Sequence, residues 1–486
     1  RINFCGVLTV LCSEIRHCAK RRTVMCNPKK TELMDNIDLT KIKYYPDRFY
    51  ICLDGFDTDN LTTFITDLNI GQQQAIFIHE YYHYLTNITS FPGIRQFHLN
   101  FCDRFRLITI LTSKEGIKAF PIKSNVLPSC KYEIEYWNSV SEIIDEDNID
   151  YKLVEETQQS PNKRFKIISI QKDEKPMDVV VNGNVINGAR FSIIINISGL
   201  VNTNSFTLTF GAIDEFLSSA IDEYLFENDL SDIDPSVLSQ RPFYPYGFYD
   251  KLLSFYKIQR PSAFEKIVIA YFAINSFNPP VKMIDILEKL KAGDYEEFQN
   301  DPEKYLLSNF SETPQYEQLL NQTNDFSTET NNQGRIHISQ ALKYYYDKFY
   351  TAQKLKEKDF FYFIRPFFVP ETNTERGKQR FLLALSRIIN QFSPPVILKD
   401  KVFRYVDKLT TFGESTMLIL ATYEIFESLK TEVIAKRPDY LKAKYTFPDQ
   451  DPNCDNFETF APPPITAVFQ MALNELNLFG IYLREL

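Results

Sequence analysis

The sequence is poor in the residues and motifs from which many catalytic sites are built. Its 486 residues include 5 His, 8 Cys, 15 Gly and 1 Trp. No C-x-x-C pair occurs, which gives little support to a zinc knuckle and makes reduced thiols the simplest expectation. None of the motifs G-x-x-x-x-G-K-[ST], G-x-G-x-x-G and G-x-S-x-G is present, which argues against the commonest nucleotide-binding sites and serine hydrolases.

Long apolar runs and an excess of positive charge are also absent. The formal net charge is −9 and the pI is about 5.4, which argues against nucleic acid as the main partner. No run of about 18 apolar residues exists, and residues 191–201 are interrupted by Asn and Ser, so no membrane span is expected. Near the start, the basic residues follow the apolar run 4–12, the reverse of a signal peptide. We therefore expect a soluble, cytoplasmic protein.

What the sequence does contain is an H-E-x-x-H motif, formed by His79, Glu80 and His83. Random placement of so few histidines would produce this pattern in roughly one chain in three hundred. Residues 72–88 are apolar at helical spacing and end before Pro92-Gly93, so we expect a buried helix. Histidines four apart lie on one helix face and can bind one metal ion, with the carboxylate of Glu80 beside it. The motif therefore predicts a zinc site in which Glu80 is the general base.

The motif in its apolar helix resembles the zincin superfamily of metallopeptidases. The metzincin branch has a third His six residues after the second, and this position is Thr89. The resemblance is therefore to the gluzincins, whose third zinc ligand is a Glu from a later helix. It implies Zn²⁺ as the cofactor, a zincin-like core and hydrolysis of peptide bonds.

Residues 211–227 form a second strongly helical segment and offer the third ligand. Glu215 and Asp222 lie seven residues apart and therefore on the same helix face. By the resemblance, Glu215 is the metal ligand and Asp222 accepts a hydrogen bond from a ligating His. The separation from His83 is far longer than in most of the family, so other third ligands stay open: Glu142, Glu223 and His98. The resemblance also implies a Tyr or His donor for the oxyanion, for which His337 is one candidate.

The length favours two or three domains, and a content of 44% hydrophobic and 24% charged residues is typical of globular proteins. We expect an α+β, predominantly helical fold with a zincin-like metallopeptidase core, a β-rich insertion and a helical C-terminal half. The expected divisions are an N-terminal segment (1–60), the active-site helix region (61–120), the β-rich insertion (121–210), the second metal-site helix with a helical subdomain (211–320), and a C-terminal helical domain (335–486).

Local patterns predict several further elements. Residues 48–53 are expected to form a strand, and residues 61–68 are a candidate for the sheet edge along which zincins bind substrate. The Asn-Gly pairs at 182–183 and 187–188 predict hairpin turns. The prolines at 394–395 are expected to start a helix, and the polar residues 321–334 to form a surface loop.

The sequence thus predicts a zinc-dependent metallopeptidase that acts on a protein or peptide substrate. The same motif also fits zinc-dependent hydrolysis of a non-peptide amide, which needs the same residues. Two alternatives of a different kind remain at this stage. The first is an interaction or scaffold protein whose zinc site is structural or degenerate, and the second is a latent protease that a protein partner activates.

Overall fold

The fold is described from a computed structural model of the chain. The structure describes residues 42–45, 49–53, 72–103, 148–158, 165–181, 184–200, 202–231, 243–310, 316–394, 396–399 and 402–405, and the isolated positions 105, 143, 445–446 and 482–483.

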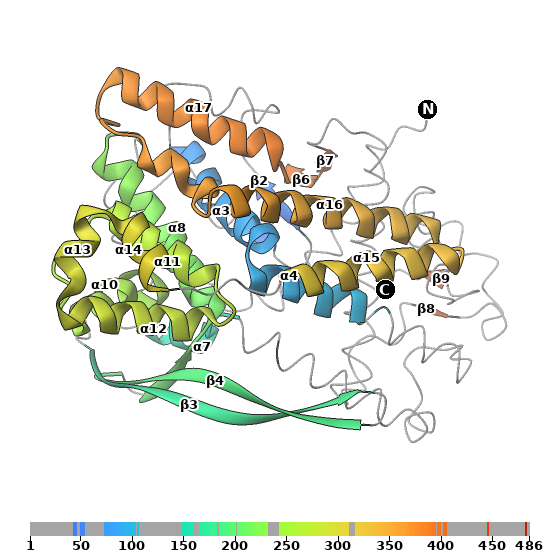
Figure 1. Cartoon of the computed structure of the whole chain (residues 1–486), viewed down its shortest axis with the longest axis horizontal. Helices are drawn as coiled ribbons and strands as arrows, with labels where there is room; N and C mark the ends of the chain where they lie inside the picture. Colours follow the sequence, from blue (N-terminus) through green and yellow to red (C-terminus); the bar gives the residue numbers. More distant parts are fainter. Residues whose placement is uncertain are drawn as a thin grey trace.

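Helices account for most of this part of the chain (Figure 1). The helical segments are α3 (Gln72–Thr89), α4 (Phe91–Phe97), η3 (His98–Asp103), α7 (Tyr151–Gln158), α8 (Phe210–Glu227), η5 (Phe243–Gly247), α10 (Phe248–Phe255), α11 (Ala263–Ile274), α12 (Pro279–Lys289), η6 (Leu290–Asp294), α13 (Tyr295–Asn300), α14 (Pro302–Asn309), α15 (Tyr316–Asn332), α16 (Ile336–Lys358), η7 (Tyr362–Phe368) and α17 (Glu375–Gln391). The strands are β1 (Ile42–Tyr45), β2 (Tyr50–Leu53), β3 (Lys166–Val181), β4 (Asn184–Ser198), β5 (Ser205–Leu208), β6 (Val396–Lys399), β7 (Val402–Tyr405), β8 (Tyr445–Thr446) and β9 (Tyr482–Leu483).

Helix α3, which carries the H-E-x-x-H motif, is buried at the centre of the fold, as its apolar sequence predicts. Tyr81, Tyr82 and Tyr84 are buried, and their hydroxyls donate to backbone carbonyls in η7 and just after α17. A short kink at Ser90 separates α3 from α4, where a side chain on Gly93 would lie 2.4 Å from the backbone of Asn87. Only glycine allows this close approach, so the Pro92-Gly93 pair does mark the end of the first helix.

Helix α8 packs against α3 and α11 (Figure 1). It begins directly after strand β5, and the side chain of Thr209 caps it by accepting a hydrogen bond from the amide of Ala212. Its apolar residues include Ile213, Phe216 and Leu217, all buried. The predicted second helix is therefore confirmed, and it lies against the first.

Strands β3 and β4 form a long antiparallel hairpin that lies along the lower edge of Figure 1, with β5 pairing with β4. Val181 and Asn184 form the last pair of the described ladder, and the turn predicted at 182–183 lies outside the described residues. The predicted turn at 187–188 is wrong, because Asn187 and Gly188 pair with Asp178 and Met177 inside the ladder. One continuous hairpin satisfies more backbone groups than two short ones.

A second sheet has the strand order β1-β2-β6-β7. Strand β2 confirms the strand expected at 48–53. The helix expected after the prolines at 394–395 is wrong, since β6 and β7 form a hairpin there and β6 pairs in parallel with β2. Pairing with a strand more than 300 residues away overrides the local helical pattern.

The surface loop expected at 321–334 is also wrong, because most of it belongs to α15. This helix lies beside α16 (Figure 1), and it buries Thr323, Phe326, Ser327 and Thr330 although its sequence is largely polar. The hydroxyls of Thr323 and Thr330 donate to carbonyls one turn earlier, which allows polar residues to be buried in a helix.

The described part of the chain is α+β and predominantly helical, as predicted. Residues 61–68, the candidate substrate-binding edge, lie outside the described residues. In the part that the structure describes, none of the helices combines the length and the apolar character needed to cross a bilayer.

Candidate metal centre

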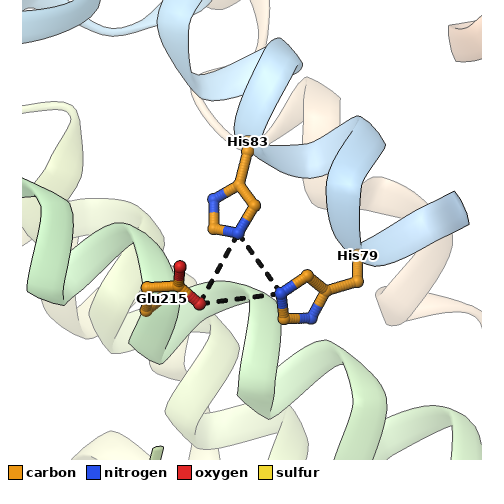
Figure 2. Close-up of side chains that lie close together, drawn as sticks. All are labelled: His79, His83 and Glu215. Atoms are coloured by element: carbon orange, nitrogen blue, oxygen red, sulfur yellow. Dashed lines mark hydrogen bonds and ion pairs between the residues drawn. The ribbon is translucent and has the colours of Figure 1, made fainter. Parts of the chain in front are cut away.

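His79, His83 and Glu215 lie together between α3 and α8, as Figure 2 shows. The Nε2 atoms of the two histidines are 3.2 Å apart. Each of them lies 3.6 Å from Oε2 of Glu215. Among the described residues, this is the one group of His, Cys, Asp and Glu side chains that could hold a metal ion.

Two buried carboxylates fix the orientation of the imidazoles. Nδ1 of His79 donates to Oδ2 of Asp222 over 2.7 Å, and Nδ1 of His83 donates to Oδ2 of Asp214 over the same distance. An ionised carboxylate only accepts hydrogen bonds, so each Nδ1 carries a proton and each Nε2 keeps its lone pair. Both lone pairs then face the space beside Glu215, which is the arrangement that a metal ion requires.

The two Nε2 atoms and Oε2 of Glu215 direct lone pairs toward one another. They repel one another unless a positive charge lies between them. Oε2 of Glu215 is buried and accepts no hydrogen bond from any residue that the structure describes. Burial alone lowers the pKa of His79, but the charge and hydrogen bond of Asp222 and the nearby carboxylate of Glu215 outweigh it and raise the pKa to about 9. The site therefore favours a positive charge at its centre, which either a proton or a metal ion could supply.

His83 and Glu215, the other two residues of the group, also favour a positive charge between them. Burial disfavours the charged forms, yet Asp214 and Glu215 raise the pKa of His83 above its usual value. For Glu215, burial is outweighed by the attraction of His83 and His79, each 3.6 Å away, which holds its pKa well below the usual range. Glu215 is thus an ionised, acceptor-only group aimed at the histidines.

The triangle formed by Nε2 of His79, Nε2 of His83 and Oε2 of Glu215 has the size expected for three ligands of a tetrahedral zinc ion. With bonds of about 2.0–2.1 Å, tetrahedral corners are roughly 3.3–3.4 Å apart, whereas neighbouring octahedral corners at the same bond length are roughly 2.9 Å apart. The distances of 3.2, 3.6 and 3.6 Å are closer to the tetrahedral value. If these three residues bound zinc, a fourth position would stay open for water or substrate, as in catalytic zinc sites.

Glu80 is partly exposed, and one of its oxygens contacts the sheet. Oε2 accepts a hydrogen bond of 2.6 Å from the backbone amide of Tyr44 in strand β1. Within the described residues, β1 pairs only with β2, so it forms the edge of its sheet. Strand β1, which the sequence did not predict, thus lies beside the motif where the segment 61–68 was proposed.

Two tyrosines of the turn η5 flank the centre. The ring of Tyr246, which is partly exposed, lies 6.3 Å from the ring of His79 between centroids. Tyr244 is fully buried, and its pKa is raised, first by burial and also by the charge of Glu215. Of these two tyrosines, Tyr246 is the one whose ring lies near the imidazole of a predicted metal ligand.

The other candidates lie elsewhere. Glu223 forms an ion pair of 2.7 Å with Lys266. His98 contacts Thr323 of α15 through Nδ1 over 3.2 Å. His337 lies on α16, outside the group of possible ligands found in the described residues, and Glu142 lies outside those residues. Glu223 and His98 thus have partners that account for them without a metal.

Asp214 is the site residue that the sequence reasoning missed. It directly precedes Glu215, and the side chains of successive helical residues point about 100° apart. Helical periodicity therefore did not place Asp214 on the face of the helix that carries Glu215 and Asp222. The structure shows that Oδ1 of Asp214 also accepts a hydrogen bond of 2.6 Å from Thr86. An Asp directly before the predicted ligand Glu215, in an apolar helix, is the signal that could have revealed it.

Comparisons of the chain with protein-family models, curated proteins and solved structures gave no match.

Proposed function

We propose that the protein is a zinc-dependent metallopeptidase of gluzincin type, with His79, His83 and Glu215 as zinc ligands. The observation that carries the proposal is the triangle of three lone-pair atoms at near-tetrahedral spacing. Two carboxylates orient the histidines toward it, and Glu80 follows the first ligand directly on the helix.

In this reaction, bound zinc would supply a Lewis acid that makes a water molecule more acidic and polarises the substrate carbonyl. Oε1 of Glu80 takes the proton of the attacking water and returns it to the leaving amine. Asp222 and Asp214 keep the protons on Nδ1 of the histidines, so that their Nε2 atoms remain ligands. The hydroxyl of Tyr246 is our candidate donor for the carbonyl oxygen of the substrate.

An extended peptide is the substrate class that the surroundings favour. Strand β1, whose Tyr44 amide binds Glu80, is the edge of its sheet, and an extended chain can add to such an edge through the backbone groups that remain. A structural zinc site normally has four protein ligands, whereas the group found among the described residues has three. This difference favours catalysis over the scaffold alternative.

Metal content measured by mass spectrometry on the purified wild type and a Glu215→Ala variant tests the ligand set. We expect about one zinc per wild-type chain, with clear loss in the variant. No zinc in wild type after zinc-replete expression would overturn the proposed centre. Zinc retained in both proteins would move the third-ligand assignment to another residue.

Cleavage of a peptide library by wild type and a Glu80→Gln variant tests the reaction. We expect zinc content to stay the same and cleavage to be lost in the variant, because the amide cannot accept the proton of water. Equal cleavage by both proteins would refute the role of Glu80. Bound zinc without any cleavage by wild type would favour a structural site, or a latent enzyme if an added partner restores activity.

A further inference from the structure

The contact between Glu80 and strand β1 has no role in the metal centre itself. Its distance is 2.6 Å, from the amide nitrogen of Tyr44 to Oε2. Within the described residues this is the only hydrogen bond to the carboxylate, so Oε1 remains available.

Tyr44 is attached to α3 at a second point. Nδ2 of Asn87 donates to the hydroxyl of Tyr44 over 3.0 Å, and the Tyr44 ring packs edge-on against Tyr84. Glu80 and Asn87 lie seven residues apart, which places them two turns apart on one helix face. Tyr44 is buried and thus bridges two turns of the motif helix through its backbone and its side chain.

The pairing of β1 explains why this amide is free to bind Glu80. In an antiparallel pair, the N–H groups of successive residues point alternately toward the partner strand and away from it. Tyr44 lies opposite Ile51 and donates to Glu80, so its N–H points away from β2, while that of Tyr45, opposite Tyr50, points toward β2. The free edge of the sheet therefore supplies the donor.

We propose that the backbone N–H of Tyr44 is a positioning group that holds one oxygen of Glu80, so that the other oxygen faces the attacking water. This inference rests on the proposed peptidase function. A glutamate side chain has several rotatable bonds, and a fixed carboxylate loses less orientational freedom in the transition state. The hydrogen bond from Tyr44 to Glu80 therefore contributes to turnover and leaves metal binding unaffected.

Replacement of Tyr44 by its α-hydroxy acid analogue, which converts the amide to an ester, removes this N–H alone. We expect kcat to fall by about tenfold to a hundredfold, with KM changed less than about twofold and zinc content unchanged. The same ester at Tyr45 is the matched control, since it removes a hydrogen bond of the strand pair instead. An unchanged kcat in the Tyr44 ester, or an equal loss in the Tyr45 ester, would overturn the inference.

Tyr44→Phe provides a second test if the esters fold poorly. It removes the bond to Asn87 and loosens the strand, so we expect a severalfold loss of kcat at constant KM. Tyr84→Phe is its control, because it removes a neighbouring hydroxyl that binds Ser393. Equal kcat values in the two variants would contradict the inference. The peptidase proposal fails separately, if Glu80→Gln cleaves as well as wild type.

Discussion

Substitution of Asp222 by Asn removes a charge behind the metal centre and changes the shape of the side chain very little. Asp222 is fully buried, and its Oδ2 lies 2.7 Å from Nδ1 of His79. The amide oxygen of Asn can still accept this hydrogen bond, so the His79 tautomer is retained. The variant therefore isolates the contribution of the negative charge to zinc binding.

The expected magnitude follows from the distance and the burial. Across the imidazole, the carboxylate lies about 6–7 Å from the metal position, and an effective dielectric constant of about 20 gives an upper bound of roughly 5 kcal/mol. Loss of a carboxylate partner of a ligating His typically weakens metal binding 10–100-fold, or about 1.4–2.7 kcal/mol. Since the Asp222 side chain is only 1% exposed, we expect a loss near hundredfold.

The zinc dissociation constant, measured by competition with a chromophoric chelator, is the assay. Asp214→Asn should weaken binding less, because the Asp214 side chain is 12% exposed and Thr86 also binds it. Glu223→Gln on the same helix is the control for loss of charge, since Glu223 pairs with Lys266, and its affinity should match wild type. An Asp222→Asn affinity within twofold of wild type would refute the reasoning.

Three further predictions concern pH, the oxyanion donor and the packing around α3. In the metal-free protein, the pKa of His79 is about 9, above its unfolded value of about 6.5. Protonation of His79 therefore stabilises the folded protein fully below pH 6.5, and this contribution is lost as the pH rises through 9. The melting temperature should fall over this range while zinc affinity rises, because zinc displaces the proton; flat profiles would contradict this. Tyr246→Phe should lower kcat by about 100–1,000-fold, as loss of an oxyanion donor does, with zinc content unchanged. Tyr244→Phe should preserve kcat within severalfold, and equal kcat values in the two variants would exclude Tyr246 as the donor. Lys356→Met should destabilise the protein by about 2 kcal/mol in urea unfolding, because the buried amine donates to three oxygens, including the carbonyl at the end of α3. The exposed Lys354→Met is its control, and equal midpoints for the two variants would contradict the role of Lys356.

The sequence alone was sufficient to predict the two helices of the centre and to propose the three residues that the structure brings together. His79, Glu80 and His83 are local in sequence, and helical periodicity places them on neighbouring positions of one face. The apolar residues around Glu215 likewise predict a buried helix, in which a carboxylate requires a partner. The strand at 48–53 was predictable for the same reason, since it depends on local backbone preferences.

The tertiary structure decided everything that depends on residues distant in sequence. It brought Glu215 to the histidines across an interval of 132 residues, assigned Asp222 to His79 and Asp214 to His83, and placed β1 beside Glu80. It also made strands of β6 and β7 and a helix of the polar segment of α15. Local preferences are worth a few tenths of a kcal/mol per residue, so strand pairing and packing against distant partners can reverse them.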